Sequence, residues 1–341
     1  MQDNELLLLL TSRRIAATTD AIVRLKGGAS GKQFYRIVPC GERASAIVVG
    51  FTDVEAFDLY VRNSDFYAGR SISVPGILFS LRDRSTLVLE DCGPCTLQET
   101  GAEMSDSLLN STYRSAVQLL VNLQRTPFNA TWSPPYFDLR KYQFETENHI
   151  IAKLIEFYFE YNLSRSEGIL IRQSMNTIAE TLLKTTMVFA HRDFQSSNLV
   201  LHEGKLVVTD FQDSLFAHPL YDLVSLLEDS YVKLSDKLKS DLLDYYFAIC
   251  DAQIARMRDL LEYQYGLLCI QRKLHDAGAF AAAFQTFGKS SFLKYIDGSL
   301  RNALSAMNAY PDLHTLHSLL KKMVRRHEQK NTSSHHTMDL L

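Results

Sequence analysis

Two short segments near the middle of the 341-residue chain carry the densest group of residue types that do chemistry. Residues 191–198 read HRDFQSSN, and residues 209–213 read TDFQD. Each segment adjoins short apolar runs, so Asp193, Asn198 and Asp210 are expected at strand ends that point into one cleft. Two carboxylates and an amide oxygen suit a hard cation such as Mg²⁺, which leaves positions for phosphate oxygens. A carboxylate that is not a metal ligand can then accept a proton from a substrate hydroxyl.

The same residue types also have an ordinary structural use. Asp and Asn are common at turns and helix caps, so a single HRD or DF is weak evidence of function. Here an H-x-D-x₄-N element is followed, twelve residues after the Asn, by an Asp that ends an apolar strand. This spacing is much rarer by chance, and it favours the functional interpretation.

The elements that must position these residues can be read from the apolar periodicity. Strands are predicted near the motifs at 188–190, 199–201 and 205–209, with a turn at 202–204 that brings the two segments together. In the first hundred residues, strands at 21–26, 33–38 and 44–51 form a meander, followed by a helix at 53–69 and strands at 77–81 and 86–89. From about residue 96 the spacing is helical, over 104–125, 138–161, 167–184, 220–250 and, with interruptions, 252–327. We therefore predict an α+β fold, a small antiparallel sheet carrying one helix and a larger, mostly helical part.

Composition excludes several classes of protein. The chain exceeds the roughly 250 residues that one core usually serves, so two lobes are expected. A net charge of −3 argues against a nucleic-acid partner, which usually requires a basic face. No apolar run approaches the roughly 20 residues of a membrane span. Residues 6–10 are all leucine but follow acidic residues, so they predict an amphipathic first helix instead of a signal peptide. Five cysteines form no disulfide framework, so we expect a cytoplasmic protein.

Taken together, FAHRDFQSSNLV at 189–200 and VVTDFQD at 207–213 resemble the catalytic loop and metal-binding segment of the protein-kinase-like fold. They are most similar to the aminoglycoside phosphotransferase and choline kinase family. Within it, the bacterial anomeric kinases of N-acetylmuramate and N-acetylglucosamine, which act in cell-wall recycling, look closest. Three further stretches support this narrower resemblance: GGASGKQFYRI at 27–37, LYDLVSLLEDSYV at 220–232 and LCIQRKLHDAGAF at 268–280.

The resemblance implies a two-lobed kinase-like fold that binds ATP and Mg²⁺. Asp193 would be the catalytic base or would orient the attacking hydroxyl, while Asn198 and Asp210 would hold the metal. Asp222 would bond the backbone of the catalytic loop, and His191 would support the loop. The lobes are expected at residues 1–91 and 92–326, followed by a disordered polar tail at 327–341.

The nucleotide-binding residues are also implied by the resemblance. A glycine-rich turn between the first two strands would cover the phosphates, since backbone N–H groups approach them where no side chain intervenes; the same turn is equally typical of a flexible hairpin. The strand at 44–51 lacks the lysine that this fold normally uses to hold the phosphates, and Lys32 or Arg36 is the candidate replacement. Glu55 is a candidate for the helix glutamate that pairs with that lysine, or a favourable charge in a first helical turn. The nucleotide-binding candidates are Gly28, Ser30, Gly31, Lys32 and Arg36, with Glu90 and Asp91 marked by their position at the hinge between the lobes.

Residues 92–95 read CGPC, the redox tetrapeptide of thioredoxins. A thioredoxin would have an aromatic residue before the first cysteine, where Asp91 stands, and further strands downstream, where helices are predicted. A metal site would need a second cysteine pair, but Cys250 and Cys269 lie far along a helical region. Neither use of the tetrapeptide is favoured.

Candidates for substrate contacts lie in the helical part. Glu228 and Asp229 are possible acceptors for sugar hydroxyls, with a solvated helix face as the alternative. By resemblance, Arg272, Lys273 and His275 lie near the cleft, where a cation would favour a carboxylate-bearing sugar; helix surface charge is the alternative there.

We therefore expect a monomeric small-molecule kinase that transfers the γ-phosphoryl group of ATP to a sugar hydroxyl. Two alternatives remain open. The first keeps the fold and changes the acceptor to an aminoglycoside or another small alcohol. The second is a nucleotide-binding pseudoenzyme, which the missing strand lysine favours and the intact Asp193, Asn198 and Asp210 oppose.

Overall fold

The computed structural model describes residues 10–12, 16–17, 20–25, 32–42, 44–125 and 134–338, with side chains up to residue 330. The chain folds into two compact units. The first consists of residues 1–105 and 196–214, and the second of residues 106–195 and 215–341. The two predicted motifs therefore divide between the units, with Asp193 in the second and both Asn198 and Asp210 in the first.

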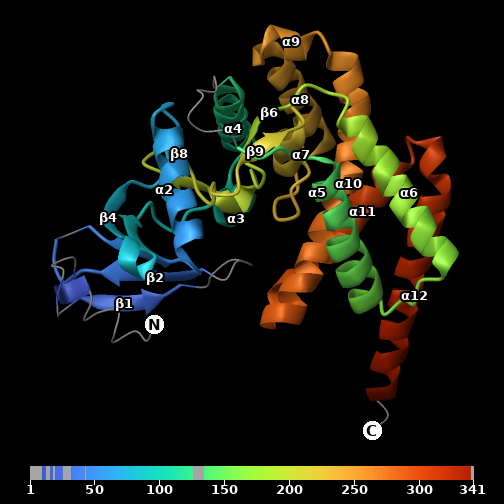
Figure 1. Ribbon diagram of the computed structural model, residues 1–341, viewed down its shortest axis with the longest axis horizontal. Coiled ribbons are helices and arrows are strands. Elements are labelled where there is room, and N and C mark those ends of the chain that lie inside the picture. The colour runs from blue at the N-terminus through green and yellow to red at the C-terminus, as the bar shows by residue number, and fades with distance from the viewer. Residues whose placement is uncertain are drawn as a thin grey trace. The chain divides into compact units, whose positions relative to one another are not determined.

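The first unit is built on a five-stranded antiparallel sheet with the strand order β1-β2-β3-β5-β4 (Figure 1). The helix α2 (Val54–Ala68) begins at Asp53, whose carboxylate caps it by accepting a hydrogen bond from the Ala56 N–H at 2.8 Å. Phe57 and Tyr60 on its buried face pack against Phe51, with ring centroids 5.8 and 5.4 Å away. The strands are β1 (Ala21–Arg24), β2 (Gln33–Val38), β3 (Ala46–Gly50), β4 (Ile77–Leu81) and β5 (Thr86–Glu90).

A two-stranded hairpin, β7 (Leu199–His202) and β8 (Lys205–Val208), completes the first unit. Its turn residues Glu203 and Gly204 have φ of 48° and 76°, the left-handed pair that a two-residue type I′ turn requires. Leu199 pairs with Val208, so the residues just before β7 and just after β8 lie at the same end of the ladder. The predicted hairpin is confirmed, and it carries Asn198 and Asp210 to that end.

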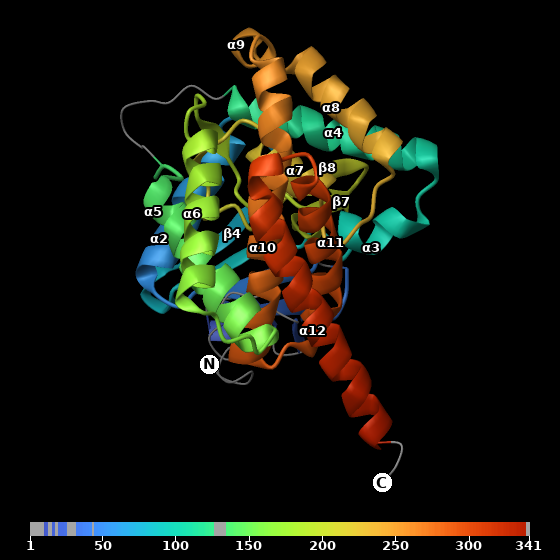
Figure 2. The same cartoon turned by 90° about the vertical axis from the view of Figure 1, so that its right-hand side faces the viewer.

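The second unit is mostly helical and is organised around the 30-residue helix α10 (Arg258–Phe287). Helix α11 (Ile296–Met307) lies along α10 in Figure 2, and a π-helix, η3 (Thr146–Tyr158), also packs on it. A short ladder joins β6 (Val188–Ala190) to β9 (Leu215–Ala217). The remaining helices are α4 (Asp106–Gln124), α5 (Leu139–Glu145), α6 (Arg165–Leu182), α7 (Tyr221–Leu227), α8 (Asp236–Ile249), α9 (Ala252–Ala255) and α12 (His314–Met338), while the one-turn helix α3 (Leu97–Thr100) belongs to the first unit.

The predicted α+β class and the five strands of the sheet are confirmed, but several details differ. The predicted helix at 138–161 is α5 followed by η3, and that at 220–250 is two helices, α7 and α8. Strand β9 was not predicted. Residues 92–105 and 196–214 group with the sheet instead of with the helical part. One cause is the hydrogen bond from the Leu201 N–H to the Cys95 carbonyl, at 2.8 Å.

The prediction of a disordered tail from residue 327 is wrong for its first residues. Helix α12 continues to Met338, and the His327 ring lies 4.6 Å from that of Tyr158. Lys330 Nζ is 3.1 Å from Glu160 Oε2. These tertiary contacts hold a polar segment in the helical conformation, although its sequence shows no apolar periodicity.

Gly278 of α10 lies where this helix packs closely on η3, and Gly298 of α11 serves as a control. A Cβ at Gly278 would overlap the backbone carbonyl of His149, whereas the nearest atom to a Cβ at Gly298 in α11 is Arg301 Nη2, 4.0 Å away. We expect Gly278→Ala to lower the free energy of unfolding by about 1–3 kcal/mol. Gly298→Ala should raise it by up to about 1 kcal/mol, since alanine is the better helix former. Chemical denaturation of both variants measures this, and equal effects would contradict the close packing.

Candidate functional site

The predicted catalytic loop is fixed by a buried carboxylate in the second unit. Asp222, in the first turn of α7, is 1 % exposed. Its Oδ2 accepts the His191 N–H at 2.6 Å and its Oδ1 accepts the Arg192 N–H at 2.9 Å. Arg192 has a φ of 81°, a conformation that a non-glycine residue rarely adopts and that the surrounding bonds must maintain. The Asp193 side chain, 33 % exposed, is thus presented from an anchored backbone.

Burial raises the pKa of Asp222 from 3.8 to about 6, and the nearby Asp193 adds to this. His191 and the two backbone N–H donors act in the opposite direction, because they favour the charged form. Burial therefore makes the ionised form of the anchoring carboxylate less favourable than it would be in water.

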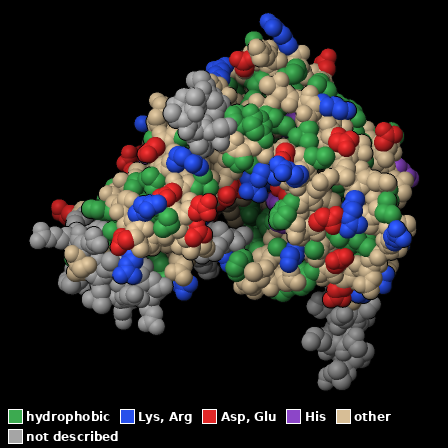
Figure 3. Space-filling view, in the orientation of Figure 1, with side chains coloured by type: hydrophobic (Ala, Val, Ile, Leu, Met, Phe, Trp, Pro, Cys, Tyr) green, Lys and Arg blue, Asp and Glu red, His purple; other side chains and the backbone are tan. Residues whose placement is uncertain are grey.

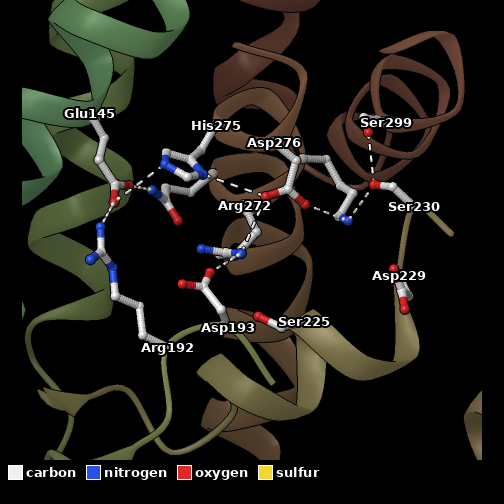
Figure 4. A network of polar contacts seen from close by, with 12 residues as sticks. Glu145, Arg192, Asp193, Ser225, Asp229, Ser230, Arg272, His275, Asp276 and Ser299 are labelled. Carbon is white, nitrogen blue, oxygen red and sulfur yellow. Dashed lines mark hydrogen bonds and ion pairs between the residues drawn. The ribbon is translucent and has the colours of Figure 1, made fainter. Parts of the chain in front are cut away.

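A buried guanidinium faces the predicted catalytic carboxylate (Figure 4). Arg272 of α10 is 1 % exposed, and its Nη2 lies 3.6 Å from Asp193 Oδ1 and 3.2 Å from Asp276 Oδ1. Its Nη1 donates to the hydroxyl of Tyr221 at 2.7 Å. Because Arg272 is surrounded by protein, it limits where the Asp193 carboxylate can point.

The neighbouring Lys273 is equally buried, and its ammonium also has partners. Lys273 Nζ is 2.7 Å from Asp276 Oδ2 and donates to Ser230 Oγ at 3.1 Å. Burial alone would raise the pKa of Asp276, but Lys273 and Arg272 outweigh it and the pKa is lowered. A buried cation without a partner would be strongly destabilising. Asp276 is a partner of both cations, and Asp193 is a second anionic partner of Arg272.

A second buried carboxylate, Glu145 at the end of α5, lies beside the loop. It is 3 % exposed, and its Oε2 accepts a hydrogen bond from Gln271 Nε2 at 2.5 Å. Its Oε1 is 3.7 Å from His275 Nε2 and 3.9 Å from Arg192 Nη2. Glu145 is therefore an ion-pair partner of the arginine that immediately precedes Asp193.

The predicted metal ligands lie at the open end of the hairpin in the first unit. The Thr209 N–H donates to the Asn198 carbonyl at 2.9 Å, which continues the ladder as far as Thr209, the residue before Asp210. Asp210 has a φ of 60°, and its carboxylate is 43 % exposed. Its Oδ1 accepts hydrogen bonds from Lys32 Nζ at 2.9 Å and from Gln212 Nε2 at 3.0 Å.

Helix α2 anchors the segment that follows Asp210. Asn63, fully buried, donates from Nδ2 to the carbonyls of Phe211 at 3.0 Å and Gln212 at 2.9 Å. The Phe211 ring packs on Tyr60 and Tyr67, with centroids 4.8 and 5.0 Å away. The left-handed Asp210 is therefore held by side-chain packing on its C-terminal side.

Asn198 and Asp210 fit the chemistry of Mg²⁺, since an amide oxygen and a carboxylate are hard oxygen donors. Across the described ranges, no group of three or more His, Cys, Asp and Glu side chains is arranged to hold a metal ion. A site of this kind would draw its remaining ligands from water or phosphate, as Mg²⁺ commonly does.

The other predicted nucleotide-binding residues lie in different surroundings. Gly28, Ser30 and Gly31 lie outside the described residues. Arg36 Nε is 2.7 Å from Asp91 Oδ2, so these two candidates pair with each other. Glu90 is exposed, and its Oε2 accepts the Gly76 N–H at 3.1 Å. Glu55 is exposed in the first turn of α2.

Cys92 is buried, and burial together with Glu90 and Asp91 raises its pKa to about 11. The thiol is therefore protonated at neutral pH, whereas thiol–disulfide chemistry requires the thiolate.

The predicted substrate residues are mostly engaged in the core. Glu228 accepts hydrogen bonds from Lys239 Nζ at 2.6 Å and from the Tyr265 hydroxyl at 2.9 Å. Asp229 is buried, and its Oδ1 accepts the Tyr231 N–H at 2.9 Å. His275 lies between Glu145 and Asp276. Arg272 and His275 are thus buried and contact Asp193, Glu145 and Asp276.

Three residues of the site were missed by the sequence analysis. Asp276 had a signal, because it stands four residues after Arg272 and three after Lys273, the spacing of helical ion pairs. Glu145 and Asn63 had none, since their partners lie 126 and 148 residues away in the chain.

Comparisons with known proteins point to one enzyme family. The sequence pattern of a family described as "Phosphotransferase enzyme family" (APH) matches residues 22–260. An N-acetylmuramate/N-acetylglucosamine kinase of Neisseria meningitidis serogroup B is 29 % identical over 265 residues, 74 % of this chain and 76 % of that protein. A protein of the same name from Pseudomonas aeruginosa is 23 % identical over 295 residues, 83 % of each chain.

Two solved structures share the fold. ADP-bound aminoglycoside phosphotransferase APH(2'')-Ib has a TM-score of 0.61 and 15 % identity, covering 90 % of this chain and 99 % of its own. A choline/ethanolamine kinase family protein from Mesorhizobium loti has a TM-score of 0.63 and 14 % identity, covering 94 % and 100 %. At these identities the likeness concerns the fold alone, and it confirms the expected kinase-like architecture.

The described surface and helices agree with the composition. Acidic and basic side chains are interspersed on the face shown in Figure 3, as a net charge of −3 suggests. None of the described helices combines the length and the apolar character that crossing a bilayer requires.

The raised pKa of Asp222 predicts a pH dependence of stability. A carboxyl whose pKa is higher in the folded state contributes stability that is complete below its unfolded pKa of 3.8 and is lost as pH rises through about 6. Asp222→Asn removes this contribution. Between pH 7.5 and pH 5, the free energy of unfolding of the wild type should therefore gain on the order of 1 kcal/mol relative to the variant. Denaturation at both pH values measures it, with the exposed Asp312→Asn as control; a constant difference between wild type and Asp222→Asn would refute the assignment.

Proposed function

The chain belongs to the phosphotransferase enzyme family, and from this premise we propose that it transfers the γ-phosphoryl group of ATP, with Mg²⁺, to a sugar hydroxyl. The proposed acceptor is the anomeric hydroxyl of N-acetylmuramate or N-acetylglucosamine, as the names of its relatives suggest. The observation that carries the proposal is the Asp193 carboxylate, which is solvent-accessible on a loop that Asp222 fixes. The action of the chain as a cytoplasmic monomer stays a prediction.

Asp193 is the group that handles the acceptor hydroxyl. Its carboxylate accepts the hydroxyl hydrogen and so orients the oxygen for attack. It takes the proton as the oxygen bonds to the γ-phosphorus and the bond from that phosphorus to the β–γ bridging oxygen breaks, releasing ADP. The guanidinium of Arg272, 3.6 Å away, favours orientations of the carboxylate that keep this ion pair. Fixing the reacting groups in this way supplies much of the rate in phosphoryl transfer.

Asn198 and Asp210 are the residues that would hold Mg²⁺. When bound, the ion neutralises negative charge on the phosphate oxygens. Lys32 is the better candidate for the missing strand lysine, because its ammonium already lies 2.9 Å from Asp210, whereas the guanidinium of Arg36 pairs with Asp91. Lys32 thus places a positive charge beside the predicted metal ligand from the residue before β2.

An ATP-consumption screen tests the proposed function. Purified protein is assayed with N-acetylmuramate, N-acetylglucosamine, kanamycin and choline, with Mg²⁺ and with EDTA. We expect Mg²⁺-dependent turnover with the amino sugars, and phosphate on the anomeric oxygen of the product by NMR. Asp193→Asn should lose at least about 100-fold in kcat, because a positioned base typically contributes 10²–10⁴-fold, while ATP binding by calorimetry is retained.

Other outcomes of the screen would contradict the proposal. Turnover of kanamycin or choline alone would make the chain a kinase of another acceptor. ATP binding without turnover of any acceptor would make it a pseudoenzyme. An Asp193→Asn variant with near-normal kcat would remove Asp193 from its assigned role.

The role of Lys32 is tested separately. Lys32→Ala should raise the KM for ATP about tenfold or more, because a charge-assisted contact to phosphate is lost. The matched control is Arg24→Ala, which removes an exposed cation from β1 of the same sheet. A KM within twofold of the wild-type value in a Lys32→Ala protein that melts normally would rule Lys32 out.

A further inference from the structure

A pocket of about 630 Å³ opens in the second unit beside the catalytic loop. Its wall is formed by residues between 135 and 149 and by Arg192, the residue that immediately precedes Asp193. Tyr136 and Phe144, 54 % and 61 % exposed, supply large aromatic surfaces on this wall. Pockets that combine apolar surface with a few fixed polar groups are typical ligand sites.

The charges on the wall favour an anionic ligand. Three lining side chains are cationic, Arg140, Lys141 and Arg192, and two are acidic, Asp138 and Glu145. His149 adds no charge at neutral pH, because burial, followed by the charge of His275, lowers its pKa to about 3. A wall with an excess of positive charge disfavours a polycationic acceptor and attracts a carboxylate.

Among these cations, Arg192 is the one built to read a carboxylate. Its backbone N–H is bound by Asp222, and its guanidinium is 32 % exposed, with Nη2 3.9 Å from Oε1 of the buried Glu145. Figure 4 shows the Arg192 side chain extending from the loop toward Glu145, beside Asp193. Glu145 is itself fixed by Gln271 and His275. An arginine guanidinium presents a planar fork of donors that matches the two oxygens of a carboxylate.

The other cations are less suited to this task. Arg140 is 90 % exposed, and its Nη2 is already 2.9 Å from Asp138 Oδ2. Arg272 and Lys273 are buried and paired with Asp276. Arg192 therefore combines exposure to the pocket, an anchored backbone, an ion pair with Glu145 and direct proximity to the residue that handles the acceptor hydroxyl.

We propose that Arg192, oriented by Glu145, binds a carboxylate on the acceptor, so that the enzyme prefers an N-acetylated amino sugar bearing a carboxylate to its neutral counterpart. This inference rests on the proposed sugar-kinase function. It makes Arg192 a specificity-determining residue, distinct from Asp193, which handles the hydroxyl common to both sugars.

The test compares kcat/KM for N-acetylmuramate and N-acetylglucosamine in the wild type, Arg192→Gln and Arg192→Lys. We expect the wild type to prefer N-acetylmuramate. Arg192→Gln should lower that preference about tenfold or more, through the KM for N-acetylmuramate, since a charge-assisted contact is lost. Arg192→Lys should lose less, because it keeps the charge and loses the fork. The control Arg172→Gln removes an arginine from an exposed pair with Glu147 and should leave the preference unchanged.

An equal loss for both sugars in Arg192→Gln would overturn the inference and leave the proposed function intact. Calorimetry of N-acetylmuramate and its neutral methyl ester, on the wild type and Arg192→Gln, judges the inference without turnover. If the wild type phosphorylates neither sugar, the proposed function fails. The carboxylate site then stands only if the wild type binds N-acetylmuramate at least tenfold more tightly than its methyl ester. Arg192→Gln must in that case lose this difference in affinity. Equal binding of acid and ester by the wild type would overturn it.

Discussion

The buried carboxylate of Asp222 sets the geometry on which the acceptor side of the site depends. By accepting two consecutive backbone N–H groups, it orders the turn that contains Arg192 in a left-handed conformation. Side chains on either side of this turn then point in directions that a relaxed loop would not maintain. Asp193 meets Arg272, and Arg192 meets Glu145. Ionising Asp222 in a buried place is unfavourable, which its raised pKa records, and the hydrogen bonds to its oxygens offset part of that cost.

Around this loop, the two buried cations lie beside carboxylates. Arg272 and Lys273 are among the least exposed side chains of the chain, and both meet Asp276. Such an arrangement contributes little net stability compared with an apolar core, because both partners lose their hydration. Its value lies in direction: the guanidinium of Arg272 remains beside Asp193, and Glu145 remains beside Arg192. The buried charges therefore serve the orientation of two exposed ones.

In the first unit, a second left-handed residue of the site is held mainly by hydrogen bonds and aromatic packing. Asp210 also has a left-handed backbone, and it is held by Asn63 and by the packing of Phe211 on the aromatic rings of α2. The ammonium beside it comes from Lys32, ahead of β2, because β3 is apolar along its whole length. The positive charge beside the predicted metal ligand therefore comes from the residue before β2 and not from β3.

The sequence by itself determined the local elements and the candidate reacting groups. Strand alternation, the capping Asp53 and the turn at 202–204 are properties of a few adjacent residues, so periodicity and turn chemistry predicted them. The spacing of Asp193, Asn198 and Asp210 was likewise readable, because a hairpin relates its two ends within a short stretch of chain. Only the tertiary structure decided which groups surround these residues. Asn63 and Lys32 meet their partners across more than a hundred residues, and Glu145 meets Gln271 across 126. Burial depends on the packing of whole helices, and it makes core residues of Arg272 and His275, for which the sequence left open a substrate contact or a surface charge.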